Sequence, residues 1–204
     1  TGTENRKMST DELRRLIKRA DYASKWEEEL SDKTIDDIDD NALMDFYNSA
    51  VHYGRLEMNK LDKNKLLSML DLCDGNYLKN AGVALFGKDT KIGLKLATYA
   101  TDDKITFTDL KLVNGNIYNL VNLAIKYVLE NIKWGVKIGS RKREETPEIP
   151  ERAIREIIVN SFAHADYESA PEIEVGIHPG KIEIYNPGTF PDDLTPFDFI
   201  NKNM

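Results

Sequence analysis

The sequence predicts an α+β fold in which a helical N-terminal part is followed by a mixed β-sheet with helices packed on one face. Apolar residues recur at helical spacing in the first third of the chain and again over 117–132. Apolar and polar residues alternate over 172–186 on both sides of the turn Pro179-Gly180, which is typical of a β-hairpin with one buried face. We therefore expect a tail and acidic linker over 1–40, a helical segment over 41–75 and an α/β sandwich over 76–204.

Composition limits the class of protein. The 204 residues, 41% of them hydrophobic, suffice for one or two cores. A single cysteine, Cys73, rules out a disulfide framework, and no apolar stretch has the length of a signal or membrane helix. We expect a soluble, cytoplasmic protein with no membrane partner. The net charge of −7 argues against broad electrostatic binding of nucleic acid by this chain.

The first forty residues divide by charge. A basic opening consists of Arg6, Lys7, Arg14, Arg15, Lys18 and Arg19. An acidic segment follows it and includes Glu27, Glu28, Glu29, Asp32, Asp36, Asp37, Asp39 and Asp40. A solvated helix face and a loop explain both, and a phosphate contact by the basic opening is the alternative. The spacing from Ser9 to Glu12 is that of a capping box and predicts a short helix, and we expect 25–40 to be an extended linker that docks through Trp26 and two isoleucines.

The elements that follow are predicted from periodicity and β-propensity. Helices are expected at about 41–53, 62–72 and 117–132, and strands at 82–86, 95–100 and 105–110. Pro147 and Pro150 lead into another helix, because proline suits the first turn of a helix.

That last helix carries a polar column. Glu156, Asn160 and His164 are spaced four residues apart, so they share one helix face. A glutamate can position or deprotonate a water, an asparagine oxygen can bind Mg²⁺, and a histidine can donate to an anion. An ordinary solvated face is the plainer explanation. However, Val159 and Ala163 lie on the same side as the column, which predicts that a second protein segment or a ligand covers it.

The hairpin after the helix adds a fourth polar residue. By parity Asn186 points to the same side as Ile182 and Ile184, which is the side that the helix should cover. Pro187-Gly188 follows as a rigid turn that a ligand can approach closely.

Residues 150–191 resemble the ATP-binding fold of the gyrase, chaperone, histidine-kinase and mismatch-repair group (GHKL, or Bergerat fold). They are more similar to the divergent GHKL-type domain of transcriptional regulators often called RecG-like DNA helicases, with the pattern REALxNAxxHRDY…IxIxNPG. The matching residues are Arg155, Glu156, Asn160, His164, Asp166, Tyr167, Asn186, Pro187 and Gly188. Less specifically, 1–9 resembles the end of that family's Schlafen/AlbA-type DNA-binding domain, and 81–87 resembles its AGxLLFG strand.

The resemblance implies the central part of a DNA-binding transcriptional regulator with an incomplete GHKL-like module for ATP and Mg²⁺. In it Glu156 would be the catalytic residue that orients water, Asn160 would hold Mg²⁺, and Asn186 and Gly188 would border the adenine. His164 would contact phosphate or, equally well, hydrogen-bond near its helix end, and Asp166-Tyr167 would touch the ligand or lock the loop.

Departures from the family pattern keep a second interpretation open. Ala165 stands where the family usually has arginine, and Asn186 is neutral where GHKL enzymes have aspartate. The sequence stops at Met204 before a second glycine-rich segment, so we expect neither turnover nor a tightly bound cofactor in this chain; the full-length protein would be at most an ATPase. DNA would be bound through the missing N-terminal domain. The alternative is a non-catalytic scaffold or dimerisation module, which would form a homodimer.

Overall fold

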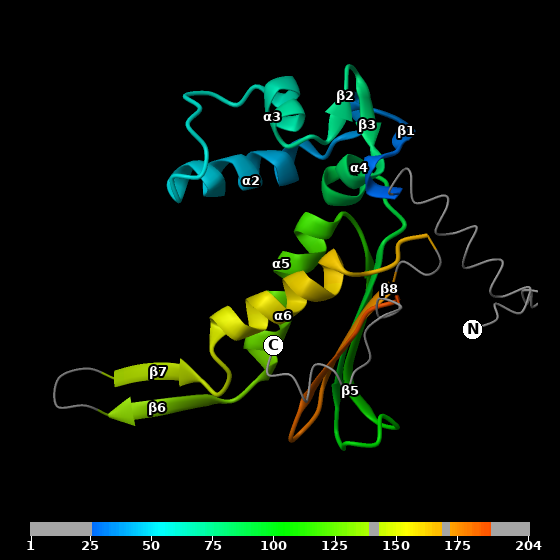
Figure 1. Cartoon of the computed structure of the whole chain (residues 1–204). Helices are drawn as coiled ribbons and strands as arrows, with labels where there is room; N and C mark the ends of the chain where they lie inside the picture. The colour runs from blue at the N-terminus through cyan, green and yellow to red at the C-terminus, as the bar shows by residue number, and fades with distance from the viewer. Residues whose placement is uncertain (1–25, 139–142, 169–171, 189–204) are drawn as a thin grey trace, which may run out of the picture.

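The computed structural model describes residues 26–138, 143–168 and 172–188, except for the side chains of 136–138 and 143–145. Helices and strands form two packed units, each around its own hydrophobic core. Figure 1 shows the N-terminal unit above the unit that contains the large sheet. The predicted α+β class is confirmed.

The N-terminal unit is mostly helical. It contains the 3₁₀ turns η1 (Trp26–Glu28) and η2 (Ile35–Asp37), and the helices α2 (Asp40–His52), α3 (Lys63–Met69) and α4 (Asn80–Phe86). A small antiparallel sheet has the order β1-β3-β2, formed by β1 (Leu30–Thr34), β2 (Cys73–Asp74) and β3 (Tyr77–Lys79). Leu43, Leu66 and Leu78 lie at the centre of its core. The predicted helices over 41–53 and 62–72 are confirmed, each capped at its start by an aspartate.

Two expectations for this unit need correction. The segment 82–86 lies in helix α4 and is not a strand. The prediction was wrong because periodicity does not distinguish a helix from a strand in a short apolar run. Gly82 allows α4 to pack closely against the backbone at Leu72, since a Cβ on residue 82 would lie 2.5 Å from the Leu72 oxygen. The acidic segment is not a plain linker either, because β1 pairs with β3. It does dock through apolar side chains, and Ile35 and Ile38 are buried.

The second unit is built on a mixed four-stranded sheet of order β5-β4-β8-β9. Its strands are β4 (Gly93–Tyr99), β5 (Phe107–Asn114), β8 (Glu172–Ile177) and β9 (Ile182–Tyr185). The only parallel pair among them is β4 with β8. Helices α5 (Ile117–Asn131) and α6 (Glu151–Ala163) pack side by side on one face, as Figure 1 shows. The predicted helix over 117–132, the hairpin over 172–186 and the packing of helices on one face of the sheet are therefore confirmed.

A two-stranded ribbon joins α5 to α6 and was not predicted. It consists of β6 (Trp134–Ile138) and β7 (Arg143–Pro147), which pair antiparallel and project away from the body of the molecule in Figure 1. The sequence from 137 to 145 is dominated by charge, so it lacks the regular apolar alternation that signals a strand.

Across the described ranges, no helix combines the length and the apolar character needed to cross a bilayer. The predicted helix behind the Ser9–Glu12 capping box lies outside the described residues.

Candidate functional site

Helix α6 is positioned by its apolar side. Ile154, Ile158 and Phe162 are buried against α5 and the sheet, each at most 4% exposed. Pro150 precedes the first turn, and the helix ends at Ala163 with His164 as its C-cap residue. This anchoring fixes the direction in which the other side of the helix projects.

A cavity of about 500 Å³ opens between α6, the end of α5 and strand β9. Its volume is in the range of ordinary small-molecule sites, roughly 300–1,000 Å³. Three of the predicted site residues, Asn160, His164 and Asn186, line it together. The rest of the lining is mainly apolar and comprises Val128, Ile149, Ala153, Ile154, Ile157, Ser161, Ile182 and Ile184. The predicted inward direction of Asn186 is confirmed by this shared wall.

The Asn186-Pro187-Gly188 turn is fastened to the end of α6. Asn186 Nδ2 donates to the backbone oxygen of His164 at 3.3 Å, and the Asp166 amide donates to the oxygen of Pro187 at 2.9 Å. Gly188 has φ +137°, and a Cβ there would lie 3.2 Å from the same His164 oxygen. Gly188 is absent from the cavity lining, so its evident task in this structure is the close approach of two backbone segments.

Tyr167 locks the loop that follows the helix. Its hydroxyl donates to the backbone oxygen of Phe162 at 2.5 Å, within the last turn of α6. Burial raises the pKa of the Tyr167 hydroxyl, which therefore remains a donor at any physiological pH. Of the two roles left open for Asp166-Tyr167, the structure supports locking of the loop.

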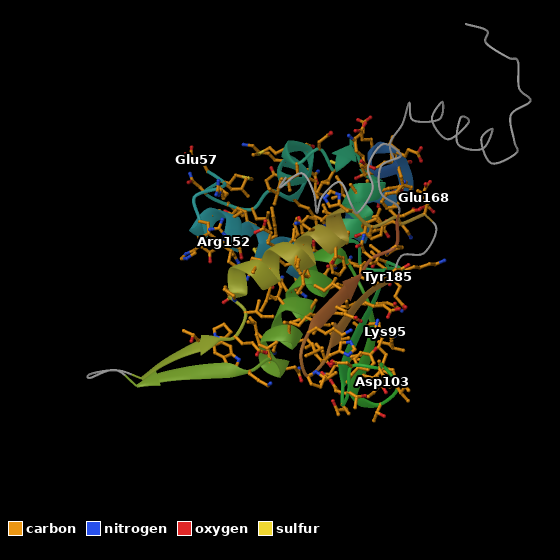
Figure 2. All side chains as sticks on the ribbon, turned by 60° about the horizontal axis from the view of Figure 1, so that its bottom comes forward. Glu57, Lys95, Asp103, Arg152, Glu168 and Tyr185 are labelled. Atoms are coloured by element: carbon orange, nitrogen blue, oxygen red, sulfur yellow. The ribbon has the colours of Figure 1, made fainter. Side chains whose placement is uncertain are left out.

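Glu156 does not join the other predicted residues. It is exposed on α6 and is not part of the cavity lining. Val159 is 43% exposed and Ala163 is also exposed, so within the described residues no second protein layer covers this side of α6. Asn160 is also exposed, at the open side of the cavity. This edge of the helix is therefore exposed to solvent. Figure 2 shows Arg152, which is on the same helix, on the side of the molecule away from Lys95 and Tyr185.

The donor set fits one Mg²⁺ ligand and not a complete metal site. Among the described residues, no group of three His, Cys, Asp or Glu side chains could hold a metal ion. Mg²⁺ bound with a nucleotide usually takes only one or two protein oxygens, and water and phosphates supply the others. Asn160 could provide such an oxygen at the cavity's open side.

A second hollow, of about 460 Å³, lies on the opposite face of the sheet. Lysine and glutamate side chains that line it already form pairs: Lys95 with Glu174 at 3.1 Å and Lys104 with Glu183 at 2.6 Å. None of the predicted site residues lines it. We therefore take the cavity beside α6 as the candidate site.

The apolar wall of that cavity was not foreseen. Ile157 lies on α6, is 59% exposed and lines the open cavity. Ile149 precedes the helix and was given no role. The only signal for Ile149 is its place between Pro147 and Pro150, and the only signal for Ile157 is an apolar residue within a helix; both predict a core position equally well.

Comparisons with known proteins identify a shared fold. No protein-family model and no curated protein matches the sequence. Among solved structures, the chain is similar to the DIP2311 protein from Corynebacterium diphtheriae, with a TM-score of 0.74 and 18% sequence identity. The similarity covers 88% of this chain and 36% of that one, so the chain spans about a third of its length. At this identity the likeness concerns the fold alone.

Proposed function

We propose that this chain is the central part of a DNA-binding transcriptional regulator and that it contains a divergent GHKL-like module for ATP. The observation that carries the proposal is the cavity beside α6, where Asn160, His164 and Asn186 meet within an apolar wall. In this role the protein acts in the cytoplasm, and DNA is bound by another domain of the longer protein.

The cavity suits a planar heterocycle. Ile149, Ile157 and Ile184 offer apolar surface to the faces of a bound ring, and Asn186, which lines the same cavity, would face the edge of that ring. The Asn186 amide nitrogen is already hydrogen-bonded to His164, whereas no described residue donates to its Oδ1. That oxygen can accept a hydrogen bond from an exocyclic amino group, without the charge that an aspartate would bring.

The open side of the cavity suits phosphate and a cation. Asn160 would supply an oxygen to Mg²⁺ and thereby hold the phosphates beside α6. The His164 ring, at the end of the helix, would donate to a phosphate oxygen. ATP supplies the transferable phosphoryl group when bound, and Glu156 would orient water only after a change that brings its carboxylate toward the cavity.

The exposed position of Glu156 favours a second candidate function. A scaffold or dimerisation module would retain the fold without needing a glutamate at the site. A homodimer whose size is indifferent to ATP would support this candidate.

Calorimetry with ATP and Mg²⁺ tests the proposal. We expect weak binding with measurable heat for the wild-type chain, in keeping with an incomplete module, and a further loss of affinity in Asn160→Ala and Asn186→Ala. Arg152→Ala is a matched control, since Arg152 is exposed on the same helix but does not line the cavity. The proposal is wrong if ATP gives no heat, or if Asn160→Ala and Arg152→Ala bind ATP equally well.

A further inference from the structure

Trp26 joins the N-terminal unit to the loop that follows α6. Its backbone oxygen accepts a hydrogen bond from Asn80 Nδ2 at 3.0 Å, which fixes it to the start of α4. Its ring stacks on Tyr167, with ring centroids 5.7 Å apart and planes inclined by 24°. The stack is therefore a side-chain contact between the first unit and the edge of the second.

Tyr167 lies in the loop that shapes the cavity. The Tyr167 hydroxyl donates a hydrogen bond to the backbone oxygen of Phe162, and the neighbouring Asp166 amide donates one to the backbone oxygen of Pro187. Asn186 in turn donates to the backbone oxygen of His164, so two hydrogen bonds join the loop 164–167 to the turn that carries Asn186. A displacement of the Tyr167 ring would thus loosen both His164 and Asn186.

We propose that Trp26 is a positioning residue for the cavity: its stack on Tyr167 holds the loop 164–167, and through it His164 and Asn186, in the geometry that receives a ligand. Because linkage is reciprocal, a ligand in the cavity must also tighten the contact at Trp26. The N-terminal unit therefore has a direct route by which it regulates the cavity. The regulatory part rests on the proposed nucleotide binding, whereas the positioning part does not.

Amide hydrogen exchange measures the positioning without any ligand. The amides of His164 and Asp166 donate to Asn160 and Pro187, so their exchange reports opening of the loop. The strength of an aromatic pair predicts that Trp26→Ala will speed their exchange by roughly 2- to 12-fold. The Ile132 amide, bonded to Val128 at the end of α5, serves as the internal reference and should not change.

Two variants sharpen the comparison. Trp26→Phe keeps an aromatic ring and should restore slow exchange. Trp134→Ala removes the other tryptophan, which is 48% exposed on the ribbon, and should leave the loop amides unchanged. Unchanged exchange at Asp166 in Trp26→Ala overturns the proposal. An equal acceleration at Ile132 also overturns it, because it would mean that Trp26 only adds to global stability.

ATP affinity, measured on the same variants, tests the regulatory part. If the wild-type chain binds ATP, Trp26→Ala should weaken binding by roughly 2- to 12-fold and Trp26→Phe should restore it. Unchanged affinity would overturn the regulation. If the wild-type chain binds no ATP, the proposed function fails and the regulation fails with it, while the exchange rates at His164 and Asp166 still decide whether Trp26 positions the loop.

Discussion

Replacing Gly188 by alanine should destabilise the fold through a single added methyl group. Gly188 has φ +137°, a conformation that side chains rarely adopt, and its Cβ would lie 3.2 Å from the His164 oxygen. A residue held in a sparsely populated backbone conformation costs about 1–3 kcal/mol. For a domain of this size each kcal/mol corresponds to about 2–4 °C in Tm, so we expect Tm to fall by about 2–12 °C.

Two other glycines separate backbone strain from the close contact in urea and thermal unfolding. Gly54 has φ +64° but open space around its Cβ position, so Gly54→Ala should cost about 1 kcal/mol. Gly180 has open space and no unusual φ, so Gly180→Ala should change stability by less than about 0.5 kcal/mol. If Gly188→Ala is no less stable than Gly180→Ala, neither the backbone conformation of residue 188 nor its approach to the His164 oxygen constrains the Asn186-Pro187-Gly188 turn.

Two further predictions concern charged side chains. Hydrogen bonds from Lys104 and Lys181 lower the pKa of Glu183 to about 2, from 4.5. Its ionised form stabilises the fold above pH 4.5, and this contribution is lost as the pH falls toward about 2. Glu183→Gln should therefore be less stable than wild type at neutral pH in urea unfolding, with a difference that disappears by about pH 2; a constant difference would contradict the assigned pairing. Asp39 caps α2 and accepts from two asparagine side chains at the start of α5, so Asp39→Ala should cost about 2 kcal/mol. Asp40→Ala removes only an exposed ion pair and should cost under about 1 kcal/mol, and equal losses in the two variants would refute the bridging role of Asp39.

The sequence predicted best where one periodic pattern fixed an orientation. The alternation around Ile182 and Ile184 determined the direction of Asn186, because neighbouring side chains on a strand must point to opposite faces. The spacing of apolar residues in α5 likewise predicted its length to within one residue, since most of its contacts are made by one face.

Prediction failed where tertiary contacts decided the outcome. Helix α4 approaches the Leu72 backbone closely at Gly82, and no local sequence pattern predicts that contact. Glu156 shares a helix face with Asn160 by spacing, but residues four apart are rotated by about 40° around a helix, and only Asn160 and His164 line the cavity. The Trp26–Tyr167 stack joins residues that are distant in the sequence, so no pattern in the sequence predicts it.

The central claim is that a nucleotide binds beside α6 and not on the opposite sheet face. The most direct measurement is a titration of the ¹⁵N-labelled chain with ATP and Mg²⁺, followed by amide NMR shifts. We predict shifts at Asn160, His164 and Asn186, with little change at Lys95 and Gly176, which line the other hollow. Shifts concentrated at Lys95 and Gly176, or no shifts at any of these amides, would contradict the claim.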